Sequence, residues 1–299
     1  MIDLSKLREM RQMYDEGANL IEYLKNQGYD KDTLSEAIMI SYDIQSGSYT
    51  RSDEQKPEVR ENYTDALAKV LNQLDGFSSI MEAGVGEATT LSRLLPKLQQ
   101  QNYTAYGFDI SWSRIKYAQA NCIKRLLQQV KLFTGDLFSI PIQSSAVDIV
   151  YTLHSLESNG GREKEALQEL YRVASSYLVL LEPMYEWASE EGKARMDKFG
   201  YIKNLYDIIK ELNYNVVEYR LLEYSVNPLN PTGLIIIKKE KSTEQDLESP
   251  LACPITKYSL SKEKDCYYSK EGLLAYPIID SIPCLLPQNA VVATHFMDS

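Results

Sequence analysis

This sequence of 299 residues lacks long apolar runs and an excess of positive charge, and it has few cysteines. No apolar stretch approaches the roughly 20 residues of a membrane-spanning helix, and the charged, amphipathic N-terminus differs from a secretory signal. The four cysteines form no dense disulfide framework, which is typical of a protein from a reducing cytosol. We therefore expect a cytoplasmic protein that makes no use of a membrane.

The charge balance indicates which kinds of molecule the protein is expected to bind. With 42 acidic and 32 basic side chains, the formal net charge is -10. Such a chain does not favour a broad phosphate-binding surface, so nucleic acid is a disfavoured partner and a small polar molecule a favoured one. The apolar fraction of 44% suits a globular protein with an ample core.

Short apolar runs alternate with helical stretches in the middle of the chain, and the last two runs have no helix between them. Strands separated by helices indicate a parallel sheet covered on both faces, and two adjoining strands indicate an antiparallel pair. We predict an α/β fold with a doubly wound, mostly parallel seven-stranded sheet of the Rossmann-like kind. The expected strands are 78–84, 104–111, 130–136, 147–155, 176–183, 215–226 and 232–240.

Regions of different composition flank this sheet. Residues 1–75 have helical spacing and predict an N-terminal helical cap, interrupted by a polar, loop-like stretch at 42–58. The sheet domain follows at 76–240, and a charged linker occupies 241–249. Residues 250–299 contain several prolines and three of the cysteines, so we expect a second, small α+β unit there.

The first predicted strand ends in a glycine loop, "EAGVGEATT", at residues 82–90. Gly84 and Gly86 allow bare backbone to approach a ligand and to present N–H donors. A dinucleotide-binding loop would have a third glycine, where this chain has Thr89. Glu82 would also repel a pyrophosphate, whereas it suits a ligand with a cationic part.

Acids also end the next two predicted strands. Asp109 is placed to accept from ribose hydroxyls, and Asp136 from an adenine amino group. Each acid alone could instead cap a helix or a turn. A ligand with ribose, adenine and a cationic amino-acid part has the chemistry of S-adenosylmethionine.

The segments "EAGVGEA", "GFDIS", "TGDLFSIPIQSSAVDIVYTLHSLE" and "LLEP", in this order, resemble the class I S-adenosylmethionine-dependent methyltransferases. The resemblance covers roughly residues 60–240. It implies that the glycine loop holds the methionine part, that the second strand end binds ribose and that the third faces adenine. The implied cofactor-binding residues are Glu82, Gly84 and Gly86, then Asp109, then Asp136 with Leu137. We also expect Ile110, next to Asp109, to contact the cofactor, and Tyr49, in the stretch "QSGSY" before the glycine loop, to cover it as a lid.

The segment after the fourth strand is where this family places substrate and catalytic groups. His154 can act as a base near neutral pH, and Glu157 can orient it or bind a substrate cation. The alternative is that His154 only forms local hydrogen bonds. Glu182, which ends the fifth strand, could contact substrate or cap the segment that follows.

The tail resembles the small zinc-ribbon-like domain that activates RNA and release-factor methyltransferases. A zinc-binding version has two C-x-x-C pairs. Here Cys253 is paired with Thr256 and Cys266 with Ser269, and Cys284 lies in an apolar segment. We predict that the metal site has been lost and that the tail is a metal-free docking module.

The function expected from these observations is methyl transfer to an oxygen or nitrogen of a small polar molecule, such as a sugar or glycan precursor. One alternative is methylation of a protein or tRNA, which the tail suggests. Another is a non-catalytic partner that binds S-adenosylmethionine. A nicotinamide oxidoreductase is disfavoured because Glu82 and Thr89 both conflict with a pyrophosphate.

Overall fold

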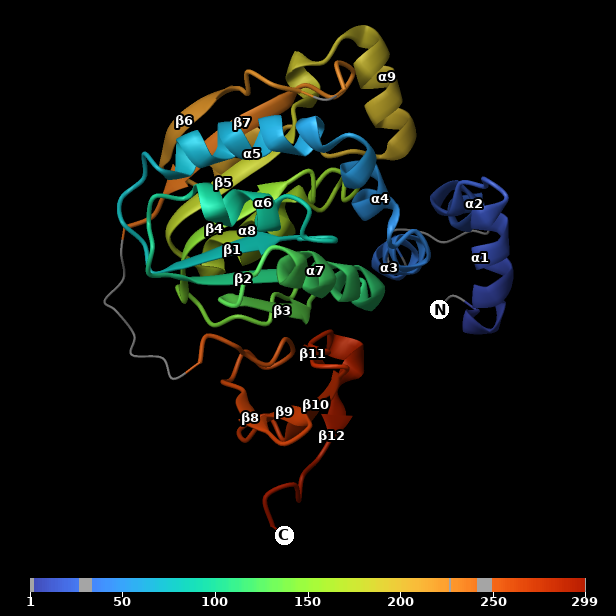
Figure 1. Ribbon diagram of the computed structural model, residues 1–299, viewed down its shortest axis with the longest axis vertical. Helices are drawn as coiled ribbons and strands as arrows, with labels where there is room; N and C mark the ends of the chain where they lie inside the picture. The colour runs from blue at the N-terminus through green and yellow to red at the C-terminus, as the bar shows by residue number, and fades with distance from the viewer. Residues whose placement is uncertain (1–2, 27–33, 226, 241–248, 299) are drawn as a thin grey trace.

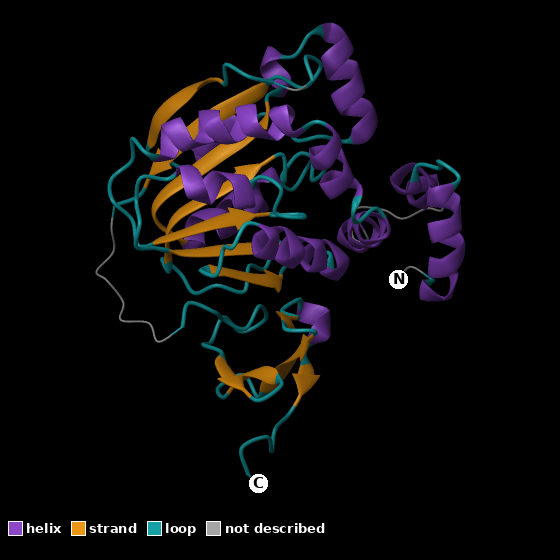
Figure 2. Ribbon diagram, viewed as in Figure 1, coloured by secondary structure: helices purple, strands orange, loops and turns teal. Residues whose placement is uncertain are grey.

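The computed structural model describes residues 3–26, 34–225, 227–240 and 249–298. A twisted central sheet with helices on both faces makes up most of this molecule (Figures 1 and 2). Most of the predicted linker, residues 241–248, lies outside the described residues. No helix in the described ranges is both long enough and apolar enough to cross a bilayer.

The central sheet has seven strands in the order β3-β2-β1-β4-β5-β7-β6. The first five strands of the chain pair in parallel, and β7 pairs antiparallel with both β5 and β6. The sheet that the sequence predicts is therefore confirmed, including its terminal antiparallel pair. The strands are β1 (Ser79–Ala83), β2 (Thr104–Asp109), β3 (Val130–Thr134), β4 (Val147–Leu153), β5 (Ala174–Pro183), β6 (Val216–Leu221) and β7 (Thr232–Lys238).

Helices cover the two faces because neighbouring strand residues point to opposite sides. Ile80 of β1 belongs to a core shared with α5, α6 and α7, while Met81 belongs to a core shared with α8 and α10. The helices are α1 (Leu7–Asp15), α2 (Leu20–Asn26), α3 (Leu34–Ile44), α4 (Ser48–Gln55), α5 (Pro57–Leu71), α6 (Leu91–Leu94), α7 (Trp112–Lys124), α8 (Glu163–Val173), α9 (Glu190–Phe199) and α10 (Leu205–Glu211).

Two local expectations from the sequence are wrong. The stretch 42–58, expected to be a loop, contains α4 and the start of α5. The helix expected after the glycine loop is only four residues long as α6, and a 3-10 turn, Leu95–Lys97, follows it. Pro96 lies in that turn, and a proline has no N–H to continue an α-helical hydrogen-bond pattern.

The C-terminal unit is a small sheet that lies against the β3 edge of the central sheet (Figure 1). Its strands are β8 (Ser261–Glu263), β9 (Cys266–Ser269), β10 (Leu274–Ile279), β11 (Ile282–Pro283) and β12 (Val291–Val292). Within residues 249–298, the helical content is the 3-10 turn Pro287–Asn289.

The docking of this unit is both polar and apolar. Cys284 forms a parallel bridge with Thr134 of β3, and the amide of Leu285 donates to the Thr134 hydroxyl at 3.0 Å. Leu285 is fully buried in the core that lies beneath α8. The tail therefore docks on its own chain and covers a strand edge that would otherwise be open.

Candidate functional site

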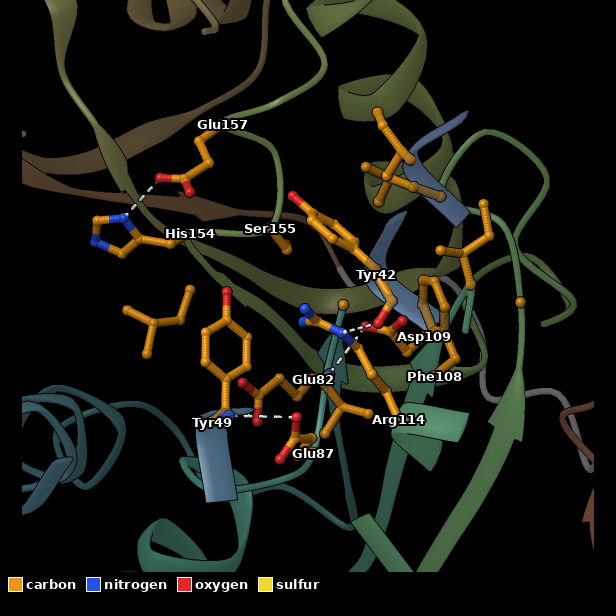
Figure 3. Close-up of a pocket in the computed structure, with 18 of the residues that line it drawn as sticks. Tyr42, Tyr49, Glu82, Glu87, Phe108, Asp109, Arg114, His154, Ser155 and Glu157 are labelled. Carbon is orange, nitrogen blue, oxygen red and sulfur yellow. Dashed lines mark hydrogen bonds and ion pairs between the residues drawn. The ribbon is translucent and has the colours of Figure 1, made fainter. Parts of the chain in front are cut away.

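One cavity lies where the carboxyl ends of β1, β2, β3 and β4 meet, and side chains of the N-terminal helices α3 and α4 also line it (Figure 3). The fold brings every site residue predicted from the sequence to the lining of this one cavity. These are Glu82, Gly84, Gly86, Asp109, Ile110, Asp136, Leu137, Tyr49, His154 and Glu157.

The glycine loop passes directly beneath the segment that follows β4. Gly84 has a φ of +75°, and a Cβ there would lie 2.3 Å from Cβ of Ser155, so no other residue fits without a shift. The amides of Gly84 and Val85 donate to the carbonyl oxygen of Phe108 at 3.0 and 2.8 Å. The expectation that this loop presents free N–H donors is therefore wrong for these two amides.

Asp109 accepts a hydrogen bond from the third amide of the loop. Its Oδ2 accepts from the amide of Gly86 at 3.0 Å, and its Oδ1 accepts from the amide of Ser111 at 2.9 Å. Burial raises the pKa of Asp109, while the charge of Arg114 acts in the opposite direction. The carboxylate joins the glycine loop to the start of α7, and its remaining lone pairs can still accept from a ligand.

Asp136 forms a turn cap as well as lining the cavity. Its Oδ1 accepts from the amide of Phe138 at 2.9 Å, and burial raises its pKa. The turn-cap role that the sequence left open is therefore present. Leu137 and Ile110 line the same cavity and supply apolar surface that suits a flat ring.

Glu82 is buried in a way that the sequence does not reveal. The Tyr151 hydroxyl donates to its Oε2 at 2.8 Å, and burial raises the pKa of Glu82 to about 8. Without a cation nearby, this group is therefore largely protonated at neutral pH. The sequence analysis assumed a negative charge here, and a cationic ligand would favour that ionised form.

His154 and Glu157 lie together at the end of β4. Nδ1 of His154 is 3.1 Å from Oε2 of Glu157, and Nε2 is 2.9 Å from the hydroxyl of Thr232 on β7. Burial lowers the pKa of His154, but the hydrogen bond and charge of Glu157 outweigh burial and the net direction is upward. Because both ring nitrogens have partners, a base role requires Nε2 to exchange Thr232 for the acceptor.

Glu182 caps a segment, but it is the segment after β4 and not the one after Pro183 that the sequence suggested. It is fully buried, and its carboxylate accepts from the amides of Ser155 and Leu156 at 3.1 and 3.2 Å. Burial raises the pKa of Glu182 to about 7. These hydrogen bonds hold the segment after β4 in place.

Glu87 is a site residue that the sequence analysis missed. Its carboxylate accepts from the amides of Gly47 at 2.8 Å and Thr50 at 2.7 Å, at the N-terminus of α4. A carboxylate is favourable at that end of a helix. The bonds hold α4 over the glycine loop, with Tyr49 at the cavity, as Figure 3 shows. The only signal in the sequence is the position of Glu87, directly after Gly86.

Arg114 is the second missed residue. It is 3% exposed, and its guanidinium lies 4.4 Å from the ring centroid of Tyr42 and 4.6 Å from that of Tyr49. Figure 3 shows its guanidinium between these two rings, beside Asp109. The rings belong to α3 and α4, so this cation joins the N-terminal helices to α7.

The C-terminal positions expected to have lost a metal have other partners. The amide of Thr256 donates to Sγ of Cys253 at 3.3 Å, and the Tyr276 hydroxyl lies 3.2 Å from the same sulfur. In the described ranges, no three His, Cys, Asp or Glu side chains are grouped to hold a metal ion. Loss of the metal remains a prediction, which elemental analysis of the purified protein checks: it should contain no stoichiometric zinc.

Comparisons with known proteins concern the central sheet and its helices. Residues 80–176 match the model of a methyltransferase domain. No curated protein matches the chain. Magnesium protoporphyrin IX methyltransferase from Synechocystis PCC 6803, solved with bound S-adenosylmethionine, aligns at 15% identity and a TM-score of 0.51, over 71% of this chain and 98% of that one.

A second solved structure shares this architecture. A chain of a Haloferax volcanii complex that contains the Trm112 methyltransferase activator aligns at 11% identity and a TM-score of 0.51. The alignment covers 66% of this chain and 97% of that chain. At these identities the likeness concerns the fold, and the central sheet with its helices has the Rossmann-like fold of class I methyltransferases.

Proposed function

We propose that this protein is an S-adenosylmethionine-dependent methyltransferase that acts on an oxygen or nitrogen of a small polar molecule. The observation that carries the proposal is the meeting of the glycine loop, Asp109 and Asp136 at one cavity. Their order along the cavity matches the order of methionine, ribose and adenine in the cofactor. The match of residues 80–176 to a methyltransferase domain supports the same reading.

The cavity argues against a dinucleotide. Three amides of the loop already donate within the protein, to Phe108 and Asp109, so a pyrophosphate would find few free donors there. The helix that follows is only four residues long and provides little dipole for phosphate binding. S-adenosylmethionine needs neither feature, because it carries no phosphate.

The acceptor side of the cavity is the end of β4. In the proposed reaction, a lone pair of the acceptor attacks the sulfonium-bound methyl carbon in line, the carbon–sulfur bond breaks, and S-adenosylhomocysteine leaves with the bonding electrons. The protein aligns the two molecules and, for an oxygen acceptor, removes a proton. Glu157 holds Nδ1 of His154, which leaves Nε2 as the site that takes a proton once Thr232 is displaced.

Methyl-labelled S-adenosylmethionine in a cell extract tests the proposed acceptor class. We expect enzyme-dependent label in the small-molecule fraction, and much less of it with Asp109→Ala when the cofactor is limiting. Enzyme-dependent label in protein or RNA instead would favour the alternative that the tail suggests. Absence of any labelled product, together with tight cofactor binding, would favour a non-catalytic partner.

Substitution of His154 then tests the chemistry with the labelled acceptor. For an oxygen acceptor, His154→Ala should lower turnover by about 10²–10⁴ and leave cofactor affinity nearly unchanged. The wild-type rate should rise with pH through the pKa of His154, which lies above the usual value near 6.5. Full turnover in the variant, with a flat pH profile, would restrict His154 to its hydrogen bonds with Glu157 and Thr232.

A further inference from the structure

The carboxylates that line the cavity already have donors of their own. Glu82 accepts from Tyr151, and Glu87 accepts from the N-terminus of α4. Asp109 accepts from two backbone amides, and Glu157 is paired with His154. The acidic side of the cavity is therefore largely satisfied without a ligand.

The two guanidinium groups that line the same cavity, those of Arg114 and Arg60, differ from these carboxylates in their partners. Nε of Arg114 donates to the carbonyl oxygen of Tyr42 at 3.1 Å, but its Nη2 is buried and has no hydrogen-bond partner. Arg60 of α5 lies 5.6 Å from the ring centroid of Tyr49. Within the described part of the chain, neither guanidinium forms an ion pair.

The location of Arg114 makes its unpartnered Nη2 costly. Arg114 lies in the first turn of α7, at the end of the helix where the dipole disfavours a cation, while the nearby charge of Asp109 acts in the opposite direction. Buried polar groups nearly always have a partner, and an unpaired buried donor costs free energy. An incoming ligand can supply the missing acceptor.

We propose that the cavity contains an oxyanion subsite, formed by Arg114 and Arg60, that binds a carboxylate. A planar guanidinium matches the two oxygens of a carboxylate, and both groups lie within 6 Å of the same Tyr49 ring centroid. The identity of the ligand depends on the proposed function. The carboxylate belongs either to the methionine part of the cofactor or to an anionic acceptor.

Calorimetry with two adenosine ligands separates these sources. 5′-Methylthioadenosine has the nucleoside but no carboxylate, whereas S-adenosylhomocysteine has both. If the cofactor's carboxylate occupies the subsite, Arg114→Met and Arg60→Met should each weaken S-adenosylhomocysteine by about 10- to 100-fold. Binding of 5′-methylthioadenosine should stay within about twofold of wild type, because the nucleoside sites are intact.

A second arm tests an anionic acceptor. If the subsite serves the acceptor, both nucleosides should bind the variants normally. Malonate should then raise the melting temperature of the S-adenosylhomocysteine complex in wild type but not in either variant. Arg125→Met is the matched control, because Arg125 follows the other end of α7, outside this cavity. It should behave as wild type in both arms.

Several outcomes would overturn the subsite. Equal weakening of both nucleosides would mean that the arginines only shape the cavity. Unchanged affinity for S-adenosylhomocysteine, with no malonate effect in wild type, would also refute it. If Arg114→Met fails to fold, Arg60→Met still decides. If wild type binds neither nucleoside, the proposed function fails, and malonate binding to the unliganded protein still tests the subsite.

Discussion

Glu82 shows how far a single side chain can depart from its expected chemistry. The sequence places an acid directly before the glycine loop, and the structure adds that the acid is buried beside Tyr151 with a pKa of about 8. A cationic ligand favours the ionised form, so it should lower this pKa and release a proton as it binds.

The affinity for S-adenosylmethionine should therefore increase with pH up to about 8 and level off above it. The sign follows because ligand binding favours the deprotonated group, which is scarce below its free pKa. Calorimetry at pH 7 in buffers of different ionisation enthalpy should detect the released proton. Glu82→Gln should abolish this release, and the uncharged 5′-methylthioadenosine should show no such pH dependence. A pH-independent affinity in wild type would contradict the assignment.

The sequence predicts which side chains lie at the strand ends, because these residues directly follow the apolar runs along the chain. The acids Asp109 and Asp136 follow short apolar runs, and carboxyl ends of parallel strands meet at one edge of a sheet. Arg114 and Glu87 could not be predicted in the same way, because their partners come from α3 and α4, far away in the sequence. Only the folded chain brings those partners together.

At the scale of elements, α4 depends on a tertiary contact. Its sequence, "SYTRSDEQ", has few apolar residues and no helical periodicity, which is why the stretch looks like a loop. The helix begins after Gly47, whose φ of +86° is left-handed, and the Glu87 carboxylate holds its first amides. The central strands can be predicted without knowledge of their tertiary contacts, because their apolar runs alone identify them.

Substitution of Glu87 tests this dependence. Glu87→Gln should loosen the N-terminus of α4, since it removes a charged acceptor worth roughly 1–3 kcal/mol. Amide exchange at residues 47–50 should accelerate, and S-adenosylhomocysteine affinity should fall as Tyr49 loses its position at the cavity. Glu54→Gln, at an exposed residue of the same helix, is the control. Unchanged exchange at 47–50 would show that α4 is held by other contacts.

At the scale of the whole molecule, the C-terminal unit supports the cofactor site from the edge of the sheet. Leu285 and Cys284 contact Thr134, which lies just before Asp136. The hydroxyl of Ser139, in the same loop as Asp136, donates to the carbonyl oxygen of Pro254 at 2.5 Å. The resemblance of the tail to an activating domain did not say where the tail docks, since that depends on surfaces that the fold creates.

Leu285→Asp should therefore reduce both stability and cofactor affinity. It places a charge at a fully buried position, and we expect a loss of about 3 kcal/mol or more in the free energy of unfolding. Denaturant unfolding and calorimetry with S-adenosylhomocysteine measure the two effects. Val292→Asp, at a residue of the same unit that is 77% exposed, should have little effect on either. Unchanged cofactor affinity in folded Leu285→Asp would separate the tail from the site.

The central claim is that the cavity holds S-adenosylmethionine and not a dinucleotide. Calorimetry of S-adenosylhomocysteine and NAD on the same protein tests it most directly. We expect the first to bind and the second not to, and Asp109→Ala to weaken the first by about 1–3 kcal/mol, because a charged acceptor for ribose is lost. NAD binding more tightly than S-adenosylhomocysteine would contradict the account.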